Sequence, residues 1–477
     1  MIKNYLKTAF RHARKYKGYT VLNLLGLVVG IVSSMLIFLW VQDEVQKDKF
    51  HAKSDHIYML WRNMYQASGE INTTPAIPQP MVAVLENDYP EIEHVSLIGW
   101  PIEFLFRRDI QTSYETGRYV SPEFLEIFSF KLLAGNPNTA LDKIHNIVIT
   151  ERVAEKYFGL DWKGKALGET FNIDERQEFV VSGVIENPGE RSSAKFDWLI
   201  NAEEYITRND WVESWFNGGF GIMISTKPSA DISALREKLR HEVNENTDYA
   251  ADERIYLQKF IDTYLYSQFE NGVPVGGRIA YVKIMTIIAV FILIIACINF
   301  MNLATARSTR RTKEIGVRKV LGAFRSALSK QFYVESFIMA VLATMIATGI
   351  VYLLLPYFNY ISSKQLFINW GDPYVWTGLA GITLITGLLS GSYPALMLSS
   401  FKVVNSLKGI VKRSATAVFF RNGLVVFQFA LSILLIIGTF VVSGQMDYVL
   451  NKNLGLDKEN VIYTVLEGSL KEKLEVY

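Results

Sequence analysis

The side chains best suited to chemistry are cations gathered in the short segment Arg307–Ser326. They are Arg307, Arg310, Arg311, Lys313, Arg318, Lys319 and Arg325, with Glu314 as the acid among them. A segment of this charge is suited to binding anionic surfaces or acidic partners. We therefore expect it to bind rather than to catalyse.

The same segment has the periodicity of a helix. Val317, Val320, Leu321 and Phe324 follow the spacing i, i+3, i+4, i+7, which places apolar side chains on one helical face. Glu314 and Arg318 stand four residues apart in the order that favours an ion pair on a helix.

Two glycines frame this segment. Gly316 and Gly322 are expected to lie at turn-rich ends, and Gly322 is suited to terminate the helix. The pattern predicts a compact helix with a basic face and an apolar face, held at both ends by apolar runs.

Three interpretations of this segment compete. It could lie on anionic lipid as a positively charged loop. It could bind nucleic acid, but no aromatic residues alternate with its cations to stack on bases, so we expect no nucleic-acid partner. We favour the third interpretation, a docking helix for a cytoplasmic partner, because a helix fixed at both ends can transmit force.

Other candidates for chemistry are weak. His51 and His56 lie near Asp48 and Asp55, but two histidines five residues apart share no helical face and fit no standard metal-ligand spacing. The segment Gly164–Glu169 contains Gly-Lys without the flanking residues of a phosphate-binding loop. No G-x-S-x-G or H-E-x-x-H motif occurs. We therefore predict no catalytic, metal-binding or cofactor-binding residue on this chain.

The composition indicates two environments in one chain. Half of the 477 residues are hydrophobic and 20% are charged, a combination typical of a protein with both membrane and soluble parts. Residues 43–277 hold 23 basic and 38 acidic side chains, whereas the rest holds 26 basic and nine acidic ones. The single cysteine, Cys297, excludes an intrachain disulfide.

Five apolar runs are long enough to cross a bilayer, which takes roughly 20 residues. We predict these spans at residues 19–40, 284–303, 334–355, 374–398 and 424–442. Residues 1–18, the loop 304–333 and the linker 399–422 are strongly basic, which places them in the cytoplasm. The N-terminus is then inside and the acidic region 43–277 outside, in a multi-pass membrane protein.

The first 18 residues have the pattern of an amphipathic helix. Residues 1–18 have apolar and basic faces that predict an amphipathic helix on the cytoplasmic side, although a disordered basic flank is the alternative.

The beginning of the chain also resembles its end. With a period of 405 residues, Gly18 matches Gly423 and Asn23 matches Gln428. We expect the span 424–442 to begin a second repeat, residues 443–477 to begin a second outer domain, and the chain to be a fragment of a longer protein.

Residues 43–277 are predicted to form a mixed α/β domain. The β-branched run Asn146–Thr150 favours a strand, followed by a helix starting at Glu151. The segment Gln177–Pro188 ends in a turn signal, Asn187-Pro188-Gly189. Gly219–Thr226 and Arg254–Phe260 are further strand candidates. Ser229 or Asp231 is expected to cap a periodic helix that contains Ile232, Leu235 and Leu239.

The segment "RRTKEIGVRKVLGA", followed by "SKQFYVESF", closely resembles the signature of MacB/FtsX-type permeases, the membrane subunits of mechanotransmitting ABC transporters. "FHAKSDHIYML", "SPEFLEIFSFKLLAGN", "IVITERVAEKYFG" and "VVSGVIENPGERSSAKFDWLI" are similar to that family's periplasmic core domain. "LSGSYPALMLSSFKVVNSLKG" is similar to the end of its fourth span. The resemblance covers essentially the whole chain.

This resemblance implies a location, a fold, a site and partners. The location is the bacterial inner membrane, with residues 43–277 in the periplasm. The fold is an α-helical transmembrane bundle, a four-span repeat plus the first span of a second, with a large mixed α/β extracytoplasmic domain. The implied site is a coupling helix seated on an ATPase subunit, with residues Lys313, Glu314, Ile315, Gly316, Arg318, Lys319, Leu321 and Gly322. ATP and magnesium would bind a separate cytoplasmic ABC ATPase, expected as a dimer. Membrane lipid and a periplasmic adaptor or cargo protein are further expected partners.

We expect the chain to couple ATP hydrolysis on that ATPase to a change in the periplasmic domain, exporting a lipoprotein, a peptide or an amphiphilic drug. The alternative is an FtsX-like regulator that activates a periplasmic partner, such as a cell-wall hydrolase, without transport. A sensor would need a cytoplasmic signalling domain, and the cytoplasmic loops are too short for one. An embedded enzyme would need a catalytic constellation that the spans lack.

Overall fold

The computed structural model divides the protein into two compact units, each described by itself. It describes residues 17–175, 177–247, 252–322, 324–399, 415–452 and 455, and their side chains except at 19, 306–316, 318, 396–399 and 415–417. The helical unit comprises residues 17–42 and the described residues from 282 onwards. The sheet unit comprises residues 43–281.

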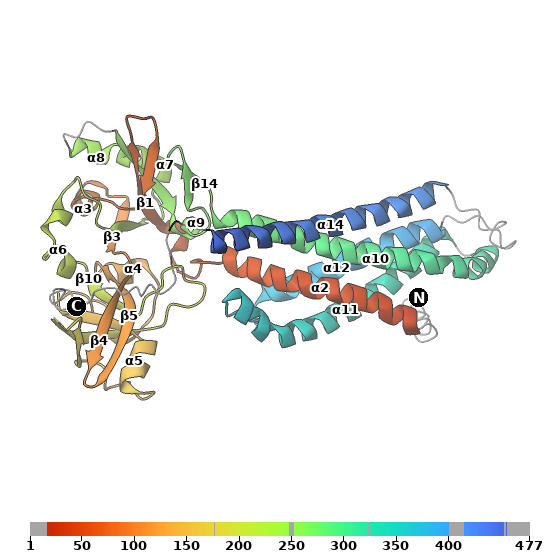
Figure 1. The fold of residues 1–477 in the computed structure, drawn as a ribbon, viewed down its shortest axis with the longest axis horizontal. Helices are drawn as coiled ribbons and strands as arrows, with labels where there is room; N and C mark the ends of the chain where they lie inside the picture. Colours follow the sequence, from red (N-terminus) through yellow and green to blue (C-terminus); the bar gives the residue numbers. More distant parts are fainter. Residues whose placement is uncertain are drawn as a thin grey trace. The chain divides into compact units, whose positions relative to one another are not determined.

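Long apolar helices build the helical unit (Figure 1). They are α2 (Lys17–Val45), α10 (Arg278–Val320), α11 (Arg325–Ser362), α12 (Pro373–Ser399) and α14 (Ala415–Asn451). Each contains a stretch long and apolar enough to span a bilayer, and each predicted span lies within one of them. The helical bundle of the predicted fold class is confirmed. The assignment of α14 to a second repeat stays a prediction.

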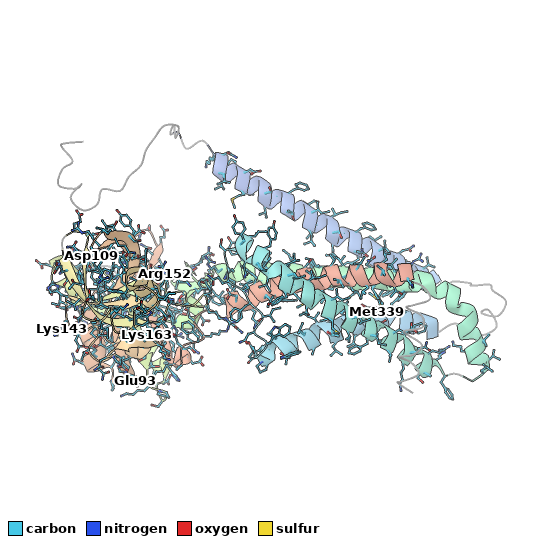
Figure 2. The ribbon with its side chains drawn as sticks, turned by 90° about the horizontal axis from the view of Figure 1, so that it is seen from below. Glu93, Asp109, Lys143, Arg152, Lys163 and Met339 are labelled. Atoms are coloured by element: carbon cyan, nitrogen blue, oxygen red, sulfur yellow. The ribbon has the colours of Figure 1, made fainter. Side chains whose placement is uncertain are left out.

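The helices differ in how much of their surface the chain itself covers. α11 and α12 pack as a hairpin in which Gly387 and Gly391 of α12 lie against Phe337 and Ser336 of α11. By contrast, α14 exposes large apolar side chains along most of its length (Figure 2). Such a surface suits contact with lipid or with another helix.

Several predicted segments lie outside the described residues. The amphipathic helix 1–18 does so except for Lys17 and Gly18, which belong to α2. Residues 400–414 of the predicted linker 399–422 are also outside, while the end of that linker belongs to α14. Of the predicted second periplasmic segment 443–477, the part up to Asn451 continues α14.

The sheet unit is mixed α/β, as predicted. Its strands are β1 (Ile57–Tyr65), β2 (Ile71–Thr74), β3 (Ile92–Ile98), β4 (Ile102–Arg108), β5 (Gln111–Val120), β6 (Leu132–Gly135), β7 (Asn146–Thr150), β8 (Thr170–Ile173), β9 (Gln177–Ile185), β10 (Trp198–Asn201), β11 (Gly221–Thr226), β12 (Glu253–Lys259), β13 (Gln268–Glu270) and β14 (Val273–Gly276). Its helices are η1 (Ser54–His56), α3 (Met81–Asp88), α4 (Phe124–Ile127), α5 (Glu151–Phe158), α6 (Glu203–Ile206), η2 (Asp210–Glu213), α7 (Ile232–Leu239), α8 (Glu242–Glu245) and α9 (Phe260–Thr263).

Part of the sheet closes on itself. The strand order is β10-β7-β9-β8-β4-β5-β3-β11-β1-β12, and β10 also pairs in parallel with β5. Strands β10, β7, β9, β8, β4 and β5 therefore form a closed ring, while β3, β11, β1 and β12 continue as an open sheet. Closure removes free strand edges from this part.

An aromatic cluster fills the ring. The fully buried Trp198 of β10 stacks on Phe104 with ring centroids 5.0 Å apart, and its Nε1 donates to the backbone oxygen of Glu115 at 2.8 Å. Gly117 of β5 lies opposite, where an added Cβ would come within 2.1 Å of the indole. The closed ring thus depends on a glycine directly beside a tryptophan.

Local patterns located several of these elements correctly. The strand predicted at Asn146–Thr150 is β7, and α5 follows it directly. Asp231 caps α7, since its carboxylate accepts hydrogen bonds from the backbone N–H groups of Ser233 and Ala234. These predictions are confirmed.

Candidate coupling path

Helix α10 carries most of the predicted coupling residues. It runs without a break for 43 residues from Arg278 to Val320, about 64 Å at 1.5 Å per residue. The hydrocarbon core of a bilayer is ~30 Å thick, so α10 is long enough to extend well beyond it. The coupling segment is therefore a continuation of a membrane span.

This continuity corrects one prediction. We expected a separate short helix with Gly316 near one end, but Gly316 lies inside α10. A glycine within a helix costs only about 1 kcal/mol relative to alanine, which neighbouring helix-forming residues such as Lys313 and Glu314 can offset. Lys313, Glu314, Ile315, Arg318 and Lys319 also belong to α10, and among these residues the structure describes the side chain of Lys319 alone.

The other predicted glycine does end the helix. Gly322 has a φ of +89°, the left-handed conformation that favours glycine, and its N–H donates to the Lys319 oxygen at 3.1 Å. Leu321 lies in the same turn, and its N–H donates to the Val317 oxygen at 3.0 Å. Phe324 then precedes α11 in an extended conformation. The chain thus passes through a tight turn between two long helices.

Apolar side chains at this turn are exposed. Leu321 is 80% exposed and Phe324 is 79% exposed, while Val317 and Val320 are about half exposed. Burial, reinforced by the charge of Arg325, lowers the pKa of Lys319. The predicted apolar stripe is therefore present on the surface, with cations beside it. Such a surface suits a partner with apolar and acidic groups.

Small residues bring α2 and α10 close together within the helical unit. Gly26, Gly30 and Ser34 repeat every four residues along one face of α2. A Cβ at Gly30 would lie 2.4 Å from the Cβ of Ala296, and the Ser34 hydroxyl donates to the Ala289 backbone oxygen at 2.9 Å. The two helices are in backbone-to-backbone contact, which favours their moving together.

Within the sheet unit, the start of α10 contacts the last turn of α2 and lies near the segment that follows it. The Arg278 guanidinium lies 3.9 Å from the Glu44 carboxylate and 4.9 Å from the centroid of the Tyr264 ring. The Lys47 ammonium approaches the same ring at 5.7 Å. Tyr264 thus lies between cations from two chain segments.

Asp48 joins the segment that follows α2 to a distant loop. Its backbone N–H donates to the Arg191 oxygen at 2.8 Å, and its carboxylate accepts from the Ser193 N–H at 2.7 Å. Lys47 also donates to the Glu190 oxygen. Burial raises the pKa of Asp48, and the hydrogen bond from Ser193 partly opposes this shift. We call these contacts of residues 47–48 with residues 190–193 the clasp.

His51 lies next to the clasp in a cluster of aromatic rings. It is 2% exposed, and its ring centroid is 4.0–6.0 Å from those of Phe50, Phe128, Phe130 and Phe260. Its Nδ1 accepts a hydrogen bond from the Ser129 N–H at 3.1 Å. Burial lowers the pKa of His51 to about 4, so the ring is neutral at pH 7. The described residues contain no cluster of three metal-ligating side chains.

Sequence reasoning missed two parts of this path. The spacing of Gly26, Gly30 and Ser34 is a recognisable signal for helix packing that could have been used. No local signal points to the clasp, because Asp48 and Ser193 are 145 positions apart.

Comparison with family models finds two consecutive matches. Residues 20–242 match the MacB-like periplasmic core domain, and residues 286–403 match the FtsX-like permease C-terminal domain. The second match contains all the predicted coupling residues.

Similar proteins include ABC transporter permeases. The permease YknZ of Bacillus subtilis is 21% identical over 416 residues, covering 84% of this chain and 98% of YknZ. The macrolide export ATP-binding/permease protein MacB of Wolinella succinogenes is 24% identical over 407 residues, covering 82% of this chain and 58% of MacB. The chain therefore spans almost all of one relative and little more than half of the other.

Solved structures of similar proteins cover part of the chain. A domain of a permease protein from Porphyromonas gingivalis has 18% sequence identity and a TM-score of 0.39, covering 44% of this chain and 92% of that domain. The extracellular domain of YknZ has 14% identity and a TM-score of 0.32, covering 42% of this chain and 99% of that domain.

Proposed function

Because the chain belongs to the MacB/FtsX-type family of ABC transporter permeases, we propose that it is the membrane subunit of a mechanotransmitting transporter. ATP binding and hydrolysis on a separate cytoplasmic ATPase move α10 and thereby reshape the sheet unit in the periplasm. The work is done on a lipoprotein, a peptide or an amphiphilic drug.

One observation carries this proposal. α10 is a single helix whose last turn and following residues present exposed apolar side chains beside cations. A continuous helix transmits displacement along its axis, because its backbone hydrogen bonds resist compression. An exposed apolar stripe is stabilised by burial against a partner. Together these features suit a helix that is pushed at one end.

The proposed roles follow the predicted site residues. Lys313, Glu314, Ile315, Gly316, Arg318, Lys319, Leu321 and Gly322 form the surface that the ATPase contacts. Two such surfaces, from two permease repeats or subunits, would match a dimeric ATPase. ATP and magnesium are held by that ATPase, and the chain itself supplies no catalytic residue. The N-terminus is cytoplasmic in this arrangement.

The sheet unit is the working part on the other side. It offers a surface for cargo or for a periplasmic adaptor, while α14 and the outer faces of the bundle contact lipid. The predicted spans lack a string of charged residues, which would usually mark an ion or solute path through the bilayer. This favours work on a substrate in the periplasm or in the outer leaflet.

A second candidate is a regulator that uses the same motion to activate a periplasmic partner without transport. The match of the helical unit to the FtsX-like permease domain supports it equally. The two candidates share the ATPase contact and differ in what the sheet unit acts on.

The ATPase contact can be tested by changing the exposed stripe. We expect Leu321→Asp with Phe324→Asp to reduce association with the cognate ATPase at least tenfold, since burying the new carboxylates is unfavourable. Phe367→Asp is the matched control, because Phe367 is 68% exposed on the connection between α11 and α12. Association is measured by co-purification and titration in lipid nanodiscs.

Both variants should unfold at the wild-type temperature, because the substituted side chains are exposed. Undiminished ATPase binding by the double variant would contradict the docking role. Equal loss in the Phe367→Asp control would show a general effect of added charge and would also contradict it.

A further inference from the structure

Strand β2 has one edge that the described chain leaves unpaired. It pairs with β1 in the register Arg62↔Thr74, Asn63↔Thr73, Met64↔Asn72 and Tyr65↔Ile71. The Gln66 N–H donates to the Glu70 oxygen, so alternate pairs from this turn, including Met64 with Asn72, face each other through hydrogen bonds. The backbone groups of Ile71 and Thr73 therefore point away from β1.

These outward groups have no hydrogen-bond partner among the described residues. Strand β11 lies on the same side of β1 as β2, but it pairs with Ile57–Met59 and ends before β2 begins. The free edge is short: Pro75 follows it with no N–H to offer, and the turn at residues 66–70 closes the other end. An unpaired edge of this kind is a template for an added strand.

A pocket of about 410 Å³ lies beside this edge. Its floor includes Arg62 and Met64 of β1 with Asn72 and Thr74 of β2, which share one face of the sheet. Its volume is within the range of small-ligand pockets, ~300–1,000 Å³. The pocket therefore lies where side chains of an added strand would project.

A loop forms the wall opposite the sheet. Phe216 is 59% exposed in this wall, and Trp215 lies next to it. A Cβ at Gly218 would lie 2.5 Å from the Ala76 oxygen, so only glycine allows the loop to approach so closely. The aromatic wall is thus held directly beside the end of β2.

The charges in the pocket compensate each other. Arg62 donates two hydrogen bonds to the Glu253 carboxylate, at 2.6 and 2.8 Å, and both side chains are more than nine-tenths buried. A bidentate pair of this kind offers little net attraction to a charged ligand. The rest of the lining is mixed, with apolar Met64, Trp215 and Phe216 and polar Asn72, Thr74, Asn217 and Thr247. The pocket therefore suits a neutral side chain.

We infer that β2 and this pocket form a binding site for an extended peptide segment. The segment adds antiparallel to the free edge, exchanges backbone hydrogen bonds with Ile71 and Thr73, and places a neutral side chain in the pocket. Backbone pairing supplies affinity, and the pocket supplies specificity for the side chain. The site rests on the sheet unit alone, so it stands or falls independently of the proposed ATPase contact.

The test uses the full chain in lipid nanodiscs without ATPase. The probe is a fluorescent, end-capped pentapeptide of alternating threonine and leucine, and its binding is measured by anisotropy. Residues opposite Ile71 and Thr73 face away from the pocket, so the threonine amides should bond to β2 while the leucine side chains enter the pocket. N-methylation of the threonine amides should weaken binding about tenfold, whereas N-methylation of the leucine amides should change it less than about threefold.

Matched variants test the protein side. Thr73→Pro removes the outward N–H and should weaken binding about tenfold. Thr73→Val keeps that N–H and loses only the hydroxyl, which donates to Asn63 at 2.7 Å, so it should bind within about twofold of wild type. Hydrogen exchange of the Ile71 and Thr73 amides should slow when the peptide binds.

Three results would overturn the inference. The first is no binding of the peptide up to about 1 mM, the limit of a weak specific complex. The second is equal binding by Thr73→Pro and Thr73→Val. The third is equal binding of the two N-methylated peptides, which would indicate contact with an apolar surface without strand pairing.

Discussion

The two ends of α10 differ in their contacts with the rest of the protein. At the first end, Arg278 lies beside the Glu44 carboxylate and the Tyr264 ring. At the last end, Leu321 and Phe324 each expose almost four-fifths of an apolar side chain. One end is held by contacts within the protein, and the other offers a surface for a partner.

Under the proposed function, this difference indicates where force would enter and leave α10. A displacement applied at the exposed end is useful only if the opposite end is attached to something that must move. Arg278 attaches this end of α10 to Glu44 in the last turn of α2. The clasp then joins the segment after α2 to the loop between β9 and β10. The contact of α2 with α10 through Gly30 and Ala296 links the two helices. The following predictions test the contacts of His51 and Asp48 in the sheet unit and the contact between α2 and α10.

The largest expected effect is on acid stability through His51. The native ring takes up a proton only near pH 4, whereas the unfolded chain does so near 6.5. The stability that the neutral ring contributes is therefore complete above pH 6.5 and is lost as the pH falls to about 4. The loss amounts to about 3 kcal/mol.

His51→Asn keeps a hydrogen-bond acceptor and should remove this pH dependence of unfolding. If the stability of wild type and that of His51→Asn changed equally with pH, the role of the neutral His51 ring would be contradicted.

Breaking the clasp should have a slightly smaller effect. Asp48→Ala leaves the Ser193 N–H without its acceptor and places alanine at a φ of +59°. Together these costs are about 2–3 kcal/mol, measured as faster hydrogen exchange and weaker stability of the sheet unit. Asp48→Asn keeps the acceptor, tolerates this conformation and avoids a buried charge.

The asparagine variant should therefore be at least as stable as wild type at neutral pH. The raised pKa of Asp48 has a definite sign: as the pH rises through that pKa, the buried carboxylate ionises and stability falls. Asp48→Asn should lack this decline. Equal destabilisation by both substitutions would show that the hydrogen bond to Ser193 is unimportant.

The smallest expected effect is on the contact between α2 and α10. In Gly30→Ala the new methyl group overlaps the Ala296 methyl group, at a cost of roughly 1–2 kcal/mol. Adding Ala296→Gly removes the overlap and should restore most of the lost stability. Thermal unfolding of the single and double variants in nanodiscs measures both. If the double variant showed no recovery, close packing of these helices would not be the cause.

Local signals in the sequence predicted much of the fold. Strand β7 follows from a β-branched run, α7 from the cap at Asp231, and the end of α10 from Gly322. The apolar runs located the long helices because each run is itself the surface that meets lipid. In all these cases neighbouring residues determine the structure.

Other features depend on residues far apart in the chain. The parallel pairing of Trp198 with Gly117 closes the ring of strands, yet nothing near either residue specifies it. The clasp between Asp48 and Ser193 has the same origin. The break expected at Gly316 was wrong because one glycine costs less than the surrounding helical hydrogen bonds contribute. The exposed stripe at the candidate site was predictable because helical spacing alone defines it.

The central claim is that α10 transmits motion as one continuous helix. The direct test compares wild type with a variant carrying three glycines inserted between Leu303 and Ala304, each reconstituted with the cognate ATPase in nanodiscs. Hydrogen exchange of the Asp48 and Ser193 amides is measured with and without ATP. The account predicts that ATP changes this exchange in wild type, while the variant binds the ATPase and hydrolyses ATP without the change. The same ATP-dependent change in the variant would contradict transmission through α10.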